Sequence, residues 1–206
     1  MTDIKISILV PAFNEETRIP KFLKKLLKFA DTNLESYEII VINDGSLDNT
    51  KETVLKIIKN YNQARLLSYD DNMGKGHAVL QGVLNAKGSF ILFIDADGSI
   101  RPPEILNMYQ IFQKFHFDII VGSRISKSSN ITESQPLSRR LLSKIFNLYS
   151  NLLFRIKIND LLCGFKGFSR EVANKIFIDL KAYRWEFDVE ILYRARKKGF
   201  KVFELP

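Results

Sequence analysis

Short apolar runs alternate along the first half of the chain with longer segments whose apolar residues recur every three or four positions. The short runs are typical of strands buried in a parallel sheet, and the longer segments are typical of amphipathic helices. The predicted strands are residues 4–10 (stopped by Pro11), 37–42, 64–69, 90–94 and 118–122. The predicted helices cover about residues 19–29, 77–86 and 103–115, with another around Val54, Leu55 and Ile58. Because strand and helix alternate four times, we predict a three-layer α/β fold with a right-handed, mostly parallel central sheet.

The pattern changes after Arg124. Residues 125–135 are polar and rich in Ser and Asn, which predicts a loop. Residues 137–158 predict a long, basic, amphipathic helix or helix pair, and shorter helices are expected around residues 172–177 and from Trp185 onward. Residues 201–205 predict one more strand. With no internal repeat and no linker composition, the chain is expected to form a single domain over residues 1–206.

Two aspartates follow the most strongly apolar of the predicted strands, residues 90–94. Asp95 and Asp97 flank one small residue, Ala96, and Gly98 comes next. An isolated Asp-x-Asp is ordinarily a solvated acidic turn. Here the buried strand delivers both carboxylates to the edge of a sheet, where they would repel each other without a cation between them. Hard oxygen ligands suit Mg²⁺ or Mn²⁺, which usually also binds substrate phosphates.

Further polar clusters occupy corresponding positions in the pattern. Asn14 with Glu15, Asp44, and the pair Asp70 and Asp71 each follow a predicted strand, as Asp95 and Asp97 do. The carboxyl ends of parallel strands meet at one edge of the sheet, which is where open α/β folds bind their ligands. The clusters therefore predict one acidic site along that edge.

Two common nucleotide sites do not fit these residues. A dinucleotide fold needs Gly-x-Gly-x-x-Gly after its first strand, and residues 11–16 read Pro-Ala-Phe-Asn-Glu-Glu. Gly74-Lys75-Gly76 does not supply the phosphate-binding loop Gly-x-x-x-x-Gly-Lys-Ser/Thr. An acidic site can accept a diphosphate only through a divalent cation. We therefore expect a sugar-nucleotide donor, a metal on Asp95 and Asp97, and Asp44 and Glu15 near the nucleoside or the metal's outer shell.

The charge of the chain adds a second indication of an anionic partner. The 206 residues carry a formal net charge of +8, which favours nucleic acid, an acidic membrane surface or phosphorylated substrates. We do not expect nucleic acid, because the acidic sheet edge would repel it. A single cysteine excludes an internal disulfide and agrees with a reducing, cytoplasmic setting. The start has no signal-peptide pattern, and no apolar run approaches the roughly 18 residues that span a bilayer.

Several motifs together resemble the family 2 glycosyltransferases, which have the GT-A fold. They are Pro11-Ala12-Phe13-Asn14-Glu15, Asn43-Asp44-Gly45-Ser46, Asn72-x-Gly74-Lys75-Gly76, Asp95-Ala96-Asp97-Gly98 and Gly122-Ser123-Arg124. Later motifs are similar to the polyprenyl-phosphate hexose synthases. They are the stretch from Pro136 to Ser143, Asp160, Cys163-Gly164-Phe165-Lys166 and Trp185-x-Phe187-Asp188-x-Glu190. The resemblance covers nearly the whole chain. It favours the dolichyl-phosphate β-glucosyltransferases over the dolichol-phosphate mannose synthases.

This resemblance implies an inverting enzyme at the cytosolic face of a membrane that moves a hexose from UDP-glucose or GDP-mannose onto a polyprenyl or dolichyl phosphate. It implies a metal, Mg²⁺ or Mn²⁺, on Asp95 and Asp97. The implied donor site comprises Pro11, Ala12, Phe13, Glu15, Asn43, Asp44, Lys75, Asp95, Ala96 and Asp97. The implied acceptor-phosphate site comprises Arg124, Arg139, Arg140 and Ser143, and guanidinium groups suit phosphate. The implied catalytic residues are Asp97, Asp160, Arg124 and Arg139.

Some alternatives stay open at this point. Asp160 could act as a general base, or it could position an arginine or contact the acceptor. A soluble relative acting on a glycan or protein hydroxyl, and a basic binding module without activity, are the other functional hypotheses. The helix expected at residues 137–158 could dock on a membrane or pack on the sheet. Relatives usually continue beyond the position of Pro206, which suggests a shortened form. The oligomeric state is not predicted.

Overall fold

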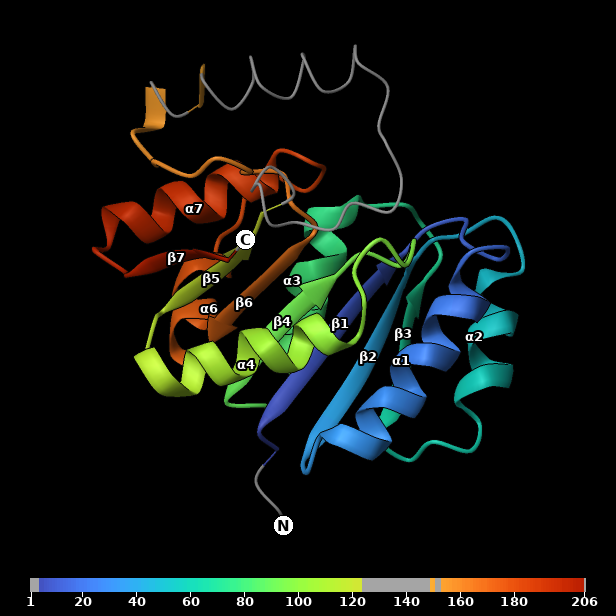
Figure 1. Cartoon of the computed structure of the whole chain (residues 1–206). Helices are drawn as coiled ribbons and strands as arrows, with labels where there is room; N and C mark the ends of the chain where they lie inside the picture. Colours follow the sequence, from blue (N-terminus) through green and yellow to red (C-terminus); the bar gives the residue numbers. More distant parts are fainter. Residues whose placement is uncertain (1–3, 124–148, 151–152, 206) are drawn as a thin grey trace.

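The computed structural model describes residues 4–123, 149–150 and 153–205 (Figure 1). All its strands belong to one sheet of seven, in the order β3-β2-β1-β4-β6-β5-β7. The strands are β1 (Ile6–Ala12), β2 (Tyr37–Asp44), β3 (Ala64–Tyr69), β4 (Phe90–Ile94), β5 (Ile119–Gly122), β6 (Phe165–Ser169) and β7 (Val202–Leu205). The helices are α1 (Ile19–Asn33), α2 (Thr50–Ile58), α3 (Lys75–Asn85), α4 (Pro103–Phe115), α6 (Arg170–Phe177) and α7 (Phe187–Lys197).

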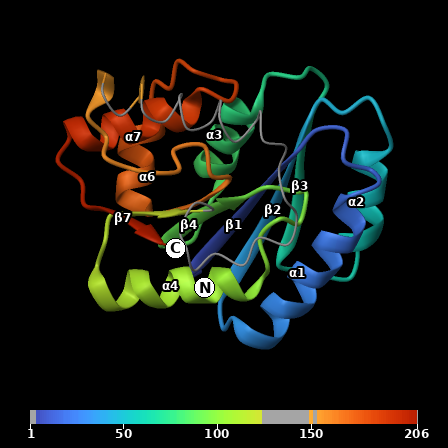
Figure 2. The same ribbon diagram turned by 45° about the horizontal axis from the view of Figure 1, so that its top comes forward.

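The helices cover both faces of the sheet, as Figures 1 and 2 show. One core cluster joins α1, α2 and α4 to one face, and a second joins α3, α6 and α7 to the other. β1, β2, β3 and β4 are mutually parallel, and β7 is parallel to β5. The predicted three-layer α/β fold with a mostly parallel sheet is confirmed.

β1 does not stop at Pro11. It continues to Ala12, which pairs with Asn43 of β2. Pairing with β4 ends earlier, at Leu9, so the last residues of β1 have a neighbour on one side only. Proline lacks the N–H donor of a ladder, and it is tolerated where a strand has an unpaired side. The expected break at Pro11 was wrong for this reason.

α2 turns a different face to the core from the one expected. Its buried residues are Thr50, Val54 and Ile58, which recur every four positions, whereas Leu55 is 48% exposed. A step of one residue rotates the helix by about 100°, which carries Leu55 away from the sheet. The prediction that Leu55 belongs to the apolar face was wrong.

The strand that the pattern did not predict is β6. It lies antiparallel between β4 and β5, at the centre of one half of the sheet. Its sequence, Phe-Lys-Gly-Phe-Ser, places a lysine and a glycine in a buried strand. Gly167 is needed because a Cβ there would lie 2.2 Å from the ring of Phe90. The same features that fit β6 to its neighbours therefore remove its apolar pattern.

The elements after β6 agree with the predicted ones to within a few residues, and β7 forms as expected. The loop predicted at residues 125–135 and most of the helix predicted at residues 137–158 lie outside the described residues. Residues 149–150 and 153–154 are helical, but Arg155 and Lys157 have φ angles of 51° and 61°. The helix therefore does not reach Ile158, contrary to expectation. In the described ranges, no helix combines the length and apolar character needed to cross a bilayer.

Candidate active site

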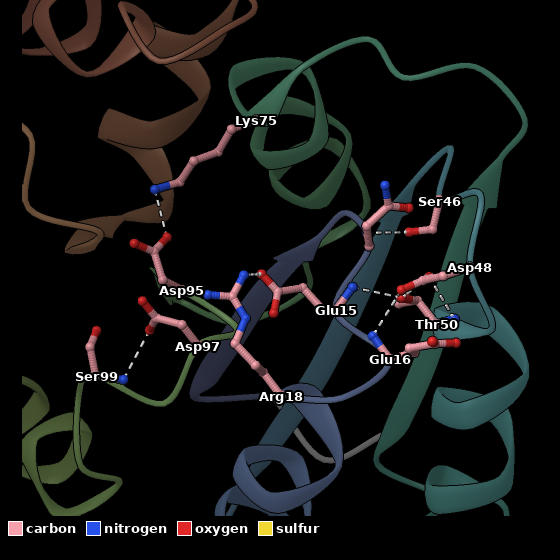
Figure 3. A network of polar contacts seen from close by, with 11 residues as sticks. Glu15, Glu16, Arg18, Ser46, Asp48, Thr50, Lys75, Asp95, Asp97 and Ser99 are labelled. Atoms are coloured by element: carbon pink, nitrogen blue, oxygen red, sulfur yellow. Dashed lines mark hydrogen bonds and ion pairs between the residues drawn. The ribbon is translucent and has the colours of Figure 1, made fainter.

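The carboxyl ends of β1, β2 and β4 lie at one edge of the sheet, with Asp44 at the end of β2. Figure 3 shows Glu15, Asp95 and Asp97 at this edge. Asp95 follows β4 directly, and its backbone N–H donates to the carbonyl of Gly164, 3.1 Å away. Asp97 lies in the exposed turn beyond it, where its Oδ1 accepts from the N–H of Ser99 at 2.9 Å. A main-chain hydrogen bond thus fixes the backbone of Asp95, and another fixes the carboxylate of Asp97.

Lys75 lies beside Asp95, the first of these two aspartates. The Nζ atom of Lys75, the first residue of α3, lies 2.6 Å from Oδ1 of Asp95. The ammonium also contacts the rings of Phe93 and Phe187, at 5.6 and 6.0 Å from their centroids. Burial alone would lower the pKa of Lys75, but the carboxylates of Asp95 and Asp188 outweigh it and raise that pKa. Lys75 is therefore a charged internal partner of Asp95.

Glu15 faces the same two aspartates from the loop after β1. Its Oε1 lies 2.6 Å from a guanidinium nitrogen of Arg18, and the side chain is 12% exposed. Burial raises the pKa of Glu15, and the negative charges of Asp97 and Asp95 raise it further against the opposing effect of Arg18. Among the described residues, its Oε2 atom is buried without a hydrogen-bond partner. An uncompensated carboxylate oxygen beside two more carboxylates fits a site that receives a cation.

Asp44, at the end of β2, is engaged with the loop before α3. Its two carboxylate oxygens accept from the backbone N–H groups of Met73 and Gly74 at 3.0 and 2.9 Å. The Asn72 amide donates to it as well, and Asp44 is 3% exposed. Asp44 therefore fixes the start of α3 and, with it, the position of Lys75. Its expected contact with a nucleoside stays a prediction.

The remaining donor-site candidates line the same edge. Pro11 and Ala12 are buried at the end of β1, and Ala96 is buried between the two aspartates. Asn43 is buried too, and its amide donates to the hydroxyl of Ser68. Phe13 differs, because its side chain is 41% exposed and open to contact with a ligand.

Asp160 lies in the loop that precedes β6, and it is 1% exposed. Its backbone N–H donates to Glu204, and its carbonyl accepts from the N–H of Cys163. The loop leads on to Gly164 beside Asp95. The role of Asp160 stays a prediction. Arg124, Arg139, Arg140 and Ser143 lie outside the described residues, so the acceptor-phosphate site also stays a prediction.

Two features of the site were missed by reasoning from the sequence. A Cβ on Gly164 would lie 1.8 Å from Oδ2 of Asp95, so only glycine fits against that carboxylate. Lys166 and Asp188 form a buried ion pair of 2.5 Å beneath the site, with side chains 0% and 4% exposed. All three residues belong to motifs already noted as family markers. That was the available signal, but it carried no information about these contacts.

The carboxylates at this edge of the sheet are consistent with a cation that is also bound by phosphate oxygens. In the ranges that the structure describes, no group of three or more His, Cys, Asp or Glu side chains could hold a metal ion. Mg²⁺ and similar ions are often bound by one or two carboxylates, with water and substrate phosphates completing the shell. Asp95 and Asp97, with Glu15 facing them, fit that kind of site.

The chain is similar to known proteins in family, sequence and fold. Residues 7–177 match the family described as Glycosyl transferase family 2. Dolichyl-phosphate beta-glucosyltransferases of Dictyostelium discoideum and Drosophila melanogaster are 36% and 37% identical, in each case over 98% of this chain. The chain spans only 65% and 66% of their lengths.

A solved structure shows the same fold. It is that of glucosyl-3-phosphoglycerate synthase from Mycobacterium tuberculosis in complex with Mn²⁺, UDP and phosphoglyceric acid. It is 18% identical, with a TM-score of 0.74 over 98% of this chain and 68% of that one. The α/β architecture is thus that of the GT-A transferases, and the chain belongs to glycosyl transferase family 2.

Proposed function

We propose that this protein transfers glucose from UDP-glucose to dolichyl phosphate or a related polyprenyl phosphate, with inversion at the anomeric carbon. The observation that carries the proposal is the convergence of Asp95, Asp97 and Glu15 at the carboxyl edge of the sheet, beside the Lys75 ammonium. The names of the relatives described above favour glucose as the sugar and dolichyl phosphate as the acceptor.

The carboxylates Asp95 and Asp97 would hold Mg²⁺ or Mn²⁺ together with the donor diphosphate. When bound, the cation supplies positive charge that offsets the charge developing on the departing UDP. Lys75 is close enough to Asp95 to contact the same diphosphate. Phe13 follows β1 and is exposed, so it is available to pack against the nucleoside. Glu15 follows two residues later in the same loop.

In the transfer step, an oxygen of the lipid phosphate forms a bond to the anomeric carbon while the bond from that carbon to UDP breaks. UDP leaves with the electron pair. A phosphomonoester has a second pKa of about 6 and is largely dianionic at neutral pH, so no strong base is needed to activate it. We therefore assign Asp160 a positioning role toward the acceptor rather than proton abstraction. Arg124, Arg139, Arg140 and Ser143 are the proposed contacts of the acceptor phosphate.

A lipid acceptor would place the reaction at a membrane surface, and the resemblance to polyprenyl-phosphate hexose synthases favours the cytosolic face. The net charge of +8 supports contact with acidic lipid head groups. The basic segment at residues 137–158 would make this contact.

A transfer assay tests this proposal. The purified chain is incubated with dolichyl phosphate in detergent, Mn²⁺, and either radiolabelled UDP-glucose or radiolabelled GDP-mannose. The expected product is dolichyl phosphate glucose from UDP-glucose alone, lost on addition of EDTA and in Asp97→Ala. Transfer from GDP-mannose and not from UDP-glucose would contradict the proposed donor. Transfer to a glycan or protein hydroxyl, with none to the lipid phosphate, would contradict the proposed acceptor.

A further inference from the structure

Lys75 stands where the local rules of helix formation disfavour a cation. It is the first residue of α3, at the positive end of the helix dipole, and the first turn holds no acidic residue. We propose that Lys75 is an internal counter-ion of Asp95 that makes the divalent cation and the donor diphosphate bind as a unit. This inference rests on the proposed function and assigns a coupling mechanism to the same site.

Both oxygens of Asp95 are engaged on the protein side. Oδ1 is 2.6 Å from Nζ of Lys75, and Oδ2 faces Gly164 so closely that no Cβ fits there. The Asp95 charge is therefore already compensated by the protein itself. Asp97, by contrast, is exposed, and its Oδ1 accepts a hydrogen bond from the Ser99 N–H.

The surroundings of Lys75 keep its ammonium at Asp95. The rings of Phe93 and Phe187 contact it from the protein side. The next carboxylate inward, Asp188, is paired with Lys166, whose ammonium lies 5.5 Å from the same Phe93 ring. A retreat of Lys75 toward Asp188 would bring two ammonium groups together. Asp95 is thus a partner that Lys75 contacts without approaching the Lys166 ammonium.

A divalent cation arriving alone at Asp95 and Asp97 meets this ammonium. The two positive charges repel each other, and Asp95 must be shared between them. A bound diphosphate reduces this repulsion, because its oxygens can coordinate the cation and also accept hydrogen bonds from the ammonium. The side chain of Lys75 is 30% exposed and has a flexible stem, so it can turn from Asp95 to the phosphate. Each ligand therefore raises the affinity for the other, and the coupling is reciprocal.

Mn²⁺ binding tests the coupling directly, without turnover. The paramagnetic resonance signal of free Mn²⁺ is followed during titration of the wild type and Lys75→Met, with and without UDP. For the wild type we expect UDP to lower the Kd for Mn²⁺ by about tenfold or more, within the usual range of coupling between sites. For Lys75→Met we expect Mn²⁺ alone to bind about threefold or more tighter than in the wild type. We expect UDP to increase the affinity for Mn²⁺ by a smaller factor than in the wild type, because only the direct contact between cation and diphosphate remains.

Two further variants serve as controls. Lys114→Met removes a lysine that also contacts an aromatic ring, that of Phe115, but lies on α4, and it should behave as the wild type. Lys75→Arg keeps the charge and should keep Mn²⁺ alone weakly bound. Circular dichroism melting confirms that each variant is folded.

The possible results distinguish a failure of the proposed coupling from a failure of the proposed function. Equal or weaker binding of Mn²⁺ alone by Lys75→Met, with UDP binding retained in the wild type, overturns the coupling and leaves the proposed function standing. Independent binding of Mn²⁺ and UDP by the wild type does the same. Failure of the wild type to bind UDP at all, with or without Mn²⁺, overturns both.

Discussion

Asp95 is the residue on which the contacts of the site converge. It receives the Lys75 ammonium on one oxygen, packs against Gly164 at the other, and donates its N–H to the carbonyl of Gly164. These contacts come from α3 and from the segment before β6, which are far apart in the sequence. The orientation of one carboxylate therefore depends on two distant parts of the chain.

Gly164→Ala tests the packing against Asp95. The new methyl group would start 1.8 Å from Oδ2 and must displace the carboxylate or the start of β6. We expect UDP-glucose binding in the presence of Mn²⁺ to weaken by about tenfold or more, the effect of a misplaced ligand side chain. Titration calorimetry measures it.

Gly199→Ala is the matched control for this substitution. Gly199 has a φ of +75°, and a Cβ there would meet nothing within 4 Å. The change should cost about 1–2 kcal/mol of stability through the left-handed backbone alone and leave donor binding intact. If Gly164→Ala only lowered stability in the same way, the proposed link to Asp95 would be wrong.

Glu15 gives a prediction about pH. Because burial and the neighbouring aspartates raise its pKa in the folded state, the folded protein binds its proton more tightly than the unfolded chain does. The ionised form therefore destabilises the fold, and stability falls as the pH rises from the unfolded pKa through the higher folded one. In EDTA at neutral pH, Glu15→Gln should melt at a higher temperature than the wild type.

The same comparison has a built-in control. Below the unfolded pKa of Glu, about 4.3, both variants carry a neutral side chain, and the difference in melting temperature should disappear. A Glu15→Gln protein that is less stable than the wild type at neutral pH would show instead that the ion pair with Arg18 dominates.

At the scale of single elements, β6 and α7 support the floor of the site through one buried ion pair. Lys166 of β6 donates to Asp188 in the first turn of α7 and to the carbonyl of Cys163, at 2.5 and 2.7 Å. Burial raises the pKa of Asp188, while Lys166 and Lys75 counteract it. The pair ties the segment before Gly164 to α7.

Replacing one partner of this pair should destabilise the fold more than replacing both. Lys166→Met leaves Asp188 buried without its partner, and we expect a loss of about 3–5 kcal/mol in the free energy of unfolding. The double variant Lys166→Met/Asp188→Leu replaces both charges with apolar groups and should recover most of that loss. Urea denaturation of the two single variants and the double variant gives the coupling. Additive losses would contradict a direct interaction.

Asp44 performs a comparable task for the loop before α3. Asp44→Asn would turn an amide NH₂ toward backbone N–H groups that now donate to a carboxylate. We expect a loss of about 1–3 kcal/mol in the free energy of unfolding, the cost of buried donors without acceptors. Asp71→Asn, at an exposed position of the same loop, is the control and should have little effect. Equal urea midpoints for both variants would argue against this role.

The elements show what the sequence could and could not reveal. β1, β2, β3 and β4, and the helices between them, follow from apolar periodicity because both faces of the sheet are covered. The placement of Asp95, Asp97, Glu15 and Asp44 at one edge follows from the direction of parallel strands. β6 did not, because Lys166 and Gly167 are specified by contacts with Asp188 and Phe90, which are distant in sequence. The pairing of Lys75 with Asp95 is invisible for the same reason.

For the molecule as a whole, a net charge of +8 coexists with an acidic site. Two exposed aromatic side chains, those of Tyr183 and Trp185, lie in the segment before α7, together with the exposed Lys181 and Arg184. Aromatic and basic side chains together suit the head-group region of a bilayer.

Binding to lipid vesicles tests this surface. The chain should sediment with vesicles containing phosphatidylserine at low ionic strength and be released at about 0.5 M NaCl, because salt screens the attraction. Trp185 is the single tryptophan, so a blue shift of its fluorescence would report that its segment enters the head-group region. Vesicles of phosphatidylcholine alone are the control. Equal binding to both, unaffected by salt, would contradict an electrostatic contact.

The cation-dependent donor site is tested most directly by calorimetric titration of UDP-glucose into the chain with Mn²⁺ and with EDTA, repeated with Asp97→Asn. Asp97 is exposed, so the substitution should leave the fold intact while removing a proposed cation ligand. We expect the wild type to bind UDP-glucose with Mn²⁺, and binding to be at least about tenfold weaker in EDTA or in Asp97→Asn. Equal affinity under all three conditions would contradict a cation-dependent donor site at Asp95 and Asp97.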